Sequence, residues 1–208
     1  SDNLNIADTA RHLAEIGAGS VSVAPVCLPP HHPDAITREH IPELRARIRE
    51  LSRIELAEML EADAVTDGWF AGKIRAVLDS AQKEYGCGGG KTYFGLAADG
   101  GIYFCSAFAS LPDFRMGNVT DGIDPAKRAR FDRQFHVDRK EPCRTCWARH
   151  LCGGGCAYDA QVACGNATAS NPVSCGQIRY GYELAMEMAI ELSERSPDLF
   201  HSLITIDE

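Results

Sequence analysis

Eight of the chain's nine cysteines lie between Cys87 and Cys175, and this concentration constrains the fold more than any other feature. A secreted disulfide scaffold is usually shorter and has an even number of cysteines. Neighbouring cysteines such as Cys143 and Cys146 have instead the spacing of metal ligands. The sequence therefore favours cysteines that bind a metal or a cluster over cysteines that form disulfides.

The densest part of this pattern has the spacing C-x2-C-x5-C-x3-C and consists of Cys143, Cys146, Cys152 and Cys156. Three consecutive glycines, residues 153–155, interrupt it, and glycine lets a backbone turn with positive φ close to an inorganic centre. Zinc ribbons usually keep two CxxC pairs about 15 to 20 residues apart, whereas only five residues separate Cys146 from Cys152. The spacing favours iron–sulfur clusters, and zinc remains the alternative.

Cys175 is expected at the start of the last helix, because Ser174-Cys175-Gly176-Gln177 matches a capping box. The N-terminus of a helix presents free N–H groups and the positive end of the macrodipole. A cluster bound by thiolates is negatively charged, so this position suits a cluster ligand.

Composition limits the class of protein. A length of 208 residues and 45% hydrophobic content are enough to build a core. The formal net charge of −8 gives no broad cationic surface, so we expect no nucleic-acid partner. The sequence has neither an apolar run of about 18 residues nor a basic and apolar leader at its start, so we expect a cytoplasmic protein without a membrane partner.

The first part of the chain, residues 1–33, resembles the end of a parallel α/β domain. An amphipathic helix is predicted over residues 6–16, and a short β-branched strand over residues 21–26. Helix, glycine turn and strand make half of a βα repeat that has no earlier strand to pair with. We therefore expect an amino-terminal portion that these 208 residues do not include.

Two further parts follow. Residues 34–86 are expected to link the first part of the chain to the last part. They are expected to form one helix that starts at Thr37 or Pro42 and a second helix over residues 68–85. The remaining residues, 87–208, are expected to form a hairpin around an Asp-Gly turn, a short helix over 126–135, and a long helix that ends near Pro197.

The cysteines and Gly100 together resemble the SPASM domain of radical SAM enzymes that modify peptides and proteins. The shared pattern is Cys87-x12-Gly100-x4-Cys105, a gap, the dense segment, a second gap and Cys175. The stretches CGGGKTYFGLAADGGIYFC, MGNV and CRTCWARHLCGGGCAYDA are similar to the thioether-forming peptide maturases and the quinohemoprotein amine dehydrogenase maturase. This resemblance covers residues 87 to about 195.

A weaker likeness extends upstream, where HLAEIGAGSVSVAPV resembles the last helix and sixth strand of the radical SAM partial barrel. The resemblance implies an α+β fold, in which a remnant of the partial α/β barrel and linking helices precede a SPASM domain with a β-hairpin, cysteine-rich loops and a C-terminal helix.

The resemblance also implies two auxiliary [4Fe–4S] clusters. The first would be bound by Cys87, Cys105 and Cys156, and the second by Cys143, Cys146, Cys152 and Cys175. Some relatives have one more cysteine at the position of Tyr93. The first cluster is therefore expected to keep one iron open to a substrate thiolate, unless Cys164 becomes its fourth ligand.

The sequence lacks the CxxxCxxC motif that holds the SAM-binding cluster of this family. S-adenosylmethionine and a third [4Fe–4S] cluster are therefore expected only on the missing amino-terminal part, and this chain alone is not expected to cleave SAM. Sulfatase-maturing relatives carry an acidic residue directly after the second cysteine. This chain has Ser106 there, which disfavours formylglycine formation and favours thioether or other crosslinks.

The function that the resemblance implies is the C-terminal portion of a radical SAM peptide or protein maturase. It would bind the substrate and act as an electron acceptor or as a ligand for a thiolate, with the remainder of the barrel as its other partner. No catalytic residue can be assigned from the sequence. The alternative is a stand-alone iron–sulfur or zinc module that docks on a partner protein.

Overall fold

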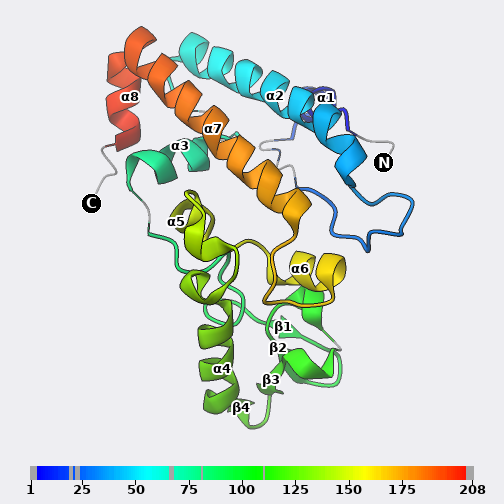
Figure 1. The fold of residues 1–208 in the computed structure, drawn as a ribbon. Coiled ribbons are helices and arrows are strands. Elements are labelled where there is room, and N and C mark those ends of the chain that lie inside the picture. Colours follow the sequence, from blue (N-terminus) through cyan, green and yellow to red (C-terminus); the bar gives the residue numbers. More distant parts are fainter. Residues whose placement is uncertain are drawn as a thin grey trace. The chain divides into compact units, whose positions relative to one another are not determined.

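The computed structural model describes residues 4–18, 21, 24–65, 68–80, 82–109 and 111–204 (Figure 1). The chain divides into two compact units, which are described separately. Residues 1–82 and 172–208 form a helical unit, and residues 83–171 form a cysteine-rich unit. Helices and one small antiparallel sheet make up the fold, so the expected α+β class is confirmed.

The helical unit is built around α7, a long helix that packs against α2, α3 and α8, while α1 packs on α2. The helices of this unit are α1 (Ile6–Glu15), α2 (Ile41–Ala62), α3 (Ala71–Leu78), α7 (Pro172–Arg195) and α8 (Pro197–Ile204). Apolar side chains at helical spacing form its core, because each helix buries one face against its neighbours. The buried residues include Leu44, Ile48, Leu51, Met59, Phe70, Ile74, Leu184, Met188 and Leu192.

A buried carboxylate fixes the start of α3. Glu55, on α2, is 6% exposed. Its Oε1 accepts the backbone N–H of Trp69 at 2.8 Å, and its Oε2 accepts that of Phe70 at 2.9 Å. These N–H groups precede the first turn of α3, where no helical carbonyl can accept them. Burial nevertheless raises the pKa of Glu55, and the two hydrogen bonds only partly oppose this rise.

Several expected elements of the helical unit differ from the structure. Two residues of the predicted strand over 21–26, 22 and 23, lie outside the described residues, and the other four do not belong to a strand. The second linking helix ends at Leu78 instead of Tyr85, because the chain then leaves the helix and the N–H of Lys83 donates to the carbonyl of His150 at 2.8 Å.

The C-terminal helix begins at Pro172, three residues before the predicted start at Cys175, and ends at Arg195, close to the expected end. Proline suits the first position of a helix because its missing N–H would have no partner there. A further helix, α8, begins with Pro197 and was not predicted. Among the described residues, no helix is both long and apolar enough to cross a membrane.

The cysteine-rich unit contains a four-stranded antiparallel sheet with the strand order β1-β2-β3-β4. Its strands are β1 (Gly95–Leu96), β2 (Gly101–Tyr103), β3 (Arg115–Asn118) and β4 (Gly122–Ile123), and its helices are α4 (Pro125–Phe135), α5 (Arg149–Cys152) and α6 (Ala157–Cys164). The predicted hairpin is confirmed, since Leu96 pairs with Ile102 across a turn in which Gly100 has a φ of +78°. Only a residue without a Cβ adopts this conformation at no steric cost.

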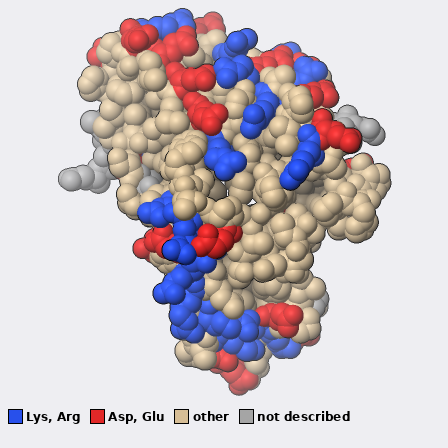
Figure 2. Space-filling model, in the orientation of Figure 1, with Lys and Arg blue, Asp and Glu red and all other residues tan. Residues whose placement is uncertain are grey.

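Helix α4 begins where the sequence predicts, and it presents two different faces. The carboxylate of Asp124 accepts the N–H groups of Ala126 and Lys127 at the start of the helix. Phe131 and Phe135 are buried against Phe104. The opposite face is exposed and basic, as the Lys and Arg side chains over α4 in Figure 2 show. This local gathering of basic residues was not predicted from the sequence.

Candidate metal centre

Three cysteines lie together near the sheet, and we call Cys87, Cys105 and Cys156 the first group. Cys105 follows β2 and is 9% exposed, whereas Cys87 and Cys156 are exposed. Burial raises the pKa of the Cys105 thiol, the neighbouring thiols of Cys156 and Cys87 raise it further, and the backbone N–H groups of Phe108 and Ala107 oppose the rise. The fold thus gathers three residues that are far apart in the sequence.

Tyr93 lies at the edge of the first group. Its hydroxyl donates to the sulfur of Cys87 at 3.7 Å. Burial and this hydrogen bond raise the pKa of Tyr93 to about 12, and the thiols of Cys105 and Cys156 add to the effect. The side chain is still 47% exposed, so the position is accessible from solvent.

A second set of three cysteines lies after α4, and we call Cys143, Cys146 and Cys152 the second group. Cys143 begins a short 3-10 helix (Cys143–Thr145), Cys146 follows it, and Cys152 ends α5. Cys143 is buried, and the other two are half-buried. Burial raises the pKa of Cys152, and the thiols of Cys143 and Cys146 raise it further. The sulfur of Cys143 also lies 3.3 Å from the hydroxyl oxygen of Ser170.

Cys175 belongs to the helical unit and is described with it. It lies in the first turn of α7, which agrees with a position near a helix N-terminus. The predicted capping box does not form, because the side-chain polar atoms of Gln177 are buried without a hydrogen-bond partner among the described residues. The earlier start of the helix at Pro172 explains this difference. Whether Cys175 joins the second group remains a prediction.

Cys164 is the last residue of α6 and is exposed. Its sulfur contacts the carbonyl oxygen of Ser170 at 3.9 Å, and the hydroxyl of that serine contacts Cys143 of the second group. Cys164 is therefore connected to the second group through Ser170. Its proposed role as a fourth ligand for the first group gains no support from this contact.

The three-glycine turn connects the two groups along the chain. Gly153, Gly154 and Gly155 all have positive φ, at +71°, +92° and +71°. A Cβ on Gly153 would collide with the backbone of Tyr85, and one on Gly86 would collide with the backbone of Gly155. The turn thus packs directly on the segment that precedes Cys87, and larger residues would separate them.

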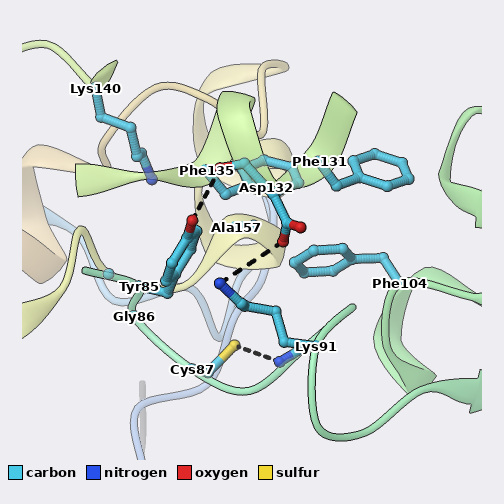
Figure 3. Close-up of a pocket in the computed structure, with 12 residues that line it drawn as sticks. Tyr85, Gly86, Cys87, Lys91, Phe104, Phe131, Asp132, Phe135, Lys140 and Ala157 are labelled. Carbon is cyan, nitrogen blue, oxygen red and sulfur yellow. Dashed lines mark hydrogen bonds and ion pairs between the residues drawn. The ribbon is translucent and has the colours of Figure 1, made fainter. Parts of the chain in front are cut away.

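A small pocket lies beside Cys87 and is lined by two lysines of different character (Figure 3). The ammonium of Lys91 is 3.7 Å from the carboxylate of Asp132 and lies over the ring of Tyr85. Lys140 is 3% exposed, and its ammonium donates to the carbonyl of Gly154 at 2.7 Å. Lys140 was not predicted from the sequence, because no motif distinguishes it from a surface lysine.

The cysteine side chains of the two groups are suited to bind a metal-containing group through their thiolates. Each set supplies three sulfur atoms, and the N–H of Gly89 donates to the sulfur of Cys87 at 3.4 Å. Nδ1 of His150, two residues before Cys152, is buried without a hydrogen-bond partner in the described part of the chain. Within the same residues, no three or more His, Cys, Asp or Glu side chains are arranged to hold a single metal ion.

Comparison with solved structures shows that the chain has a known fold. The chain superimposes on anSMEcpe, a radical SAM anaerobic sulfatase maturase, in its complex with AdoMet and the Kp18Cys peptide. The TM-score is 0.61 at 20% identity, over 90% of this chain and 55% of that one. The chain shares the fold of the matched part of anSMEcpe. The fold predicted from the cysteine pattern is therefore confirmed.

Two further matches differ in extent. The chain also matches a histidine-tagged form of anSMEcpe with bound AdoMet at a TM-score of 0.61 and 20% identity, over 95% of this chain and 55% of the other. In sequence, 88 residues are 32% identical to an uncharacterized protein of Archaeoglobus fulgidus, and they make up 41% of this chain and 21% of that protein. No family model matches the chain. This chain thus spans about half of anSMEcpe, and its matched segment spans about a fifth of the archaeal protein.

Proposed function

We propose that this chain is the auxiliary-cluster portion of a radical SAM enzyme that modifies a peptide or protein. The observation that carries the proposal is the separate clustering of two sets of three thiols within one compact unit. The fold likeness to anSMEcpe, whose structure contains AdoMet and a peptide, supports it.

Each group of cysteines would hold one [4Fe–4S] cluster. The first group would bind its cluster through three sulfur atoms, and the second group would take Cys175 as its fourth ligand. When bound, such a cluster supplies an electron acceptor and, where an iron lacks a protein thiolate, a site for another thiolate. The chain's contribution is to hold the thiols in place and to direct backbone N–H groups at them.

The open side of the first group would receive a cysteine of the substrate. Tyr93 contacts Cys87 there and is half-exposed, so a substrate can approach past its ring. Ser106, which directly follows Cys105, is exposed and has no carboxylate to act as a base. We therefore favour crosslinking through the substrate's sulfur over formylglycine formation.

The rest of the barrel would cover α1. Leu13 and Ile16, at the end of this helix, are 37% and 68% exposed, and Val26 is 49% exposed. Neighbouring exposed apolar residues often mark a site of interaction. We propose that they pack against the part of the enzyme that carries S-adenosylmethionine and the third cluster.

Metal analysis of anaerobically purified protein tests the proposal. We expect a brown protein with about eight iron and eight sulfide per chain, the content of two cubane clusters. Stoichiometric zinc without sulfide would contradict the proposal and favour the alternative, a zinc-binding module that docks on a partner.

Single substitutions test the division into two groups. Cys105→Ala in the first group and Cys143→Ala in the second should each remove about half of the iron, because every ligand belongs to one cluster. Cys27→Ala and Cys164→Ala change cysteines outside both groups and should leave the iron content unchanged. Loss of one cluster in Cys156→Ala but not in Cys105→Ala would show that the grouping is wrong.

A further inference from the structure

Helix α4 carries four exposed basic side chains, Lys127, Arg128, Arg130 and Arg133, which we call the basic face. Three of them recur every third residue, and this spacing places them on one side of the helix. Figure 2 shows Lys and Arg gathered over α4. The cysteine-rich unit has eleven Lys and Arg against nine Asp and Glu, whereas the rest of the chain has ten against twenty. The basic face thus contrasts with the acidic character of the chain as a whole.

The basic face has no acidic partner in the part of the chain that the structure describes, where none of its four side chains forms an ion pair. The only acidic residue within α4, Asp132, pairs with Lys91 at 3.7 Å. Arg130 donates to the backbone carbonyl of Asp113 at 2.9 Å and lies over the ring of Phe131. These contacts hold the guanidinium in place without neutralising its charge.

This distribution of charge is unfavourable for the helix itself. Lys127 and Arg128 lie in the first turn, where the positive end of the macrodipole disfavours cations. Like charges three residues apart repel one another along the rest of the basic face. A helix face that only meets solvent usually mixes charges of both signs. The unmixed charge of α4 therefore indicates a partner outside this chain.

Another side of α4 lies at the first group. Phe131, Asp132 and Phe135 line the pocket that also contains Cys87. The eleven residues of α4 extend about 16 Å, at about 1.5 Å each. About five residues of extended peptide cover this length. A peptide whose cysteine approaches the first group can therefore place nearby residues along the basic face.

We propose that the basic face binds an acidic segment of the peptide substrate, within about ten residues of the cysteine that approaches the first group. Clusters of arginine recognise acidic motifs through charge and through paired hydrogen bonds to carboxylates. A short acidic peptide fits better than a nucleic acid, because the net charge of −8 repels a long polyanion. The inference rests on the proposed function, since it names the class of substrate that the first group would receive.

Binding of two matched peptides tests the inference. Both are dye-labelled and twelve residues long, with a serine at the centre in place of the acceptor cysteine. One has three glutamates towards each end, and the other has glutamines there. Anaerobic fluorescence anisotropy should show that the purified chain binds the glutamate peptide at least tenfold more tightly, and that added salt weakens this binding. Equal affinities for the two peptides overturn the inference.

Removal of charge from α4 tests the location. The triple variant Lys127→Gln, Arg128→Gln and Arg133→Gln removes three charges and keeps the contacts of Arg130. It should bind the glutamate peptide about tenfold more weakly, since each exposed ion pair changes an affinity about twofold. Arg133→Gln alone should lose about twofold, and it carries the test if circular dichroism shows that the triple variant has lost its helices.

A matched control changes the same number of charges elsewhere. Arg38→Gln, Arg53→Gln and Arg75→Gln alter three exposed residues of the helical unit, and this variant should bind the glutamate peptide as the wild type does. Equal losses in the two triple variants would mean that net charge alone attracts the peptide, which overturns the inference. A single-stranded oligonucleotide of the same charge that binds α4 more tightly than the glutamate peptide also overturns it.

Failure of the proposed function gives a different result. The test peptides contain no cysteine, so their binding does not require an open iron. A purified chain without iron and sulfide would refute the cluster assignment, while the affinities of the glutamate and glutamine peptides would still test the basic face.

Discussion

Tyr93 takes the place that some related domains give to a further cysteine, and its hydroxyl lies 3.7 Å from the sulfur of Cys87. We predict that Tyr93→Cys supplies a fourth thiolate to the first group and closes its cluster. A cysteine-containing peptide should then perturb the paramagnetic resonance spectrum of the wild-type cluster but not that of the variant.

Two controls belong to this experiment. Tyr93→Phe removes only the hydroxyl, so its cluster should still respond to the peptide. A peptide with serine in place of cysteine should have no effect on either protein, since a serine hydroxyl is a far weaker ligand for iron. If the cluster of Tyr93→Cys responds as strongly as the wild-type cluster, the first group does not have an open iron.

At the scale of elements, Glu55 links α2 to the start of α3 and makes stability depend on pH. Burial raises its pKa, so the folded protein binds this proton more tightly than the unfolded chain. Stability is therefore greater below the ordinary pKa of glutamate and is lost as the pH rises through the raised value. We predict that the free energy of unfolding of the wild type, minus that of Glu55→Gln, falls as the pH rises across this range.

Urea unfolding at several pH values measures this difference. Glu61→Gln makes the same change of charge at an exposed position on α2 and corrects for the net charge of the protein. The opposite slope would mean that the hydrogen bonds to Trp69 and Phe70 outweigh burial and lower the pKa of Glu55 in the folded protein.

The helices and strands also show which of their ends can be predicted from sequence patterns. The start of α4 follows from Asp124 and Pro125, and the hairpin follows from Asp99 and Gly100, because each signal acts within a few residues. The end of α3 does not follow from a local signal, because the N–H of Lys83 donates to the carbonyl of His150, which lies far away in the sequence. Local propensity contains no information about such a partner.

At the scale of the whole molecule, the two units have different sources of stability. The helical unit has an apolar core that includes Met59, Phe70 and Ile74. The cysteine-rich unit has a smaller apolar core, which includes Phe104 and Phe108, and strands of only two to four residues. A bound cluster would therefore contribute much of its stability. We predict that a chelator that removes iron increases amide exchange throughout residues 83–171, while the middle of α2 and α7 stays protected.

Hydrogen exchange read by mass spectrometry measures both units in one sample. Protein treated with buffer alone is the control, and re-addition of iron and sulfide should restore protection. Equal loss of protection in the two units would contradict the prediction, because it would mean that they unfold together.

The grouping of the cysteines shows, at the scale of the whole fold, which contacts can be predicted from the sequence and which cannot. Spacing alone grouped Cys143, Cys146, Cys152 and Cys156. The structure brings the first three together but places Cys156 with Cys87 and Cys105. The first group was implied only by a resemblance, since its members are separated by the sheet and α4. Lys140 could not be predicted at all, because its acceptor is the backbone carbonyl of Gly154 and any residue could supply that atom.

The order of the two groups along the chain has a consequence for synthesis. The second group spans ten residues, from Cys143 to Cys152, whereas the first spans seventy, from Cys87 to Cys156. Closing the longer loop costs about 2 kcal/mol more in chain entropy, since each doubling of length adds about 0.6 kcal/mol. On the ribosome, the three second-group cysteines can meet as soon as they emerge, and the first group must wait for its last cysteine, which follows all of them.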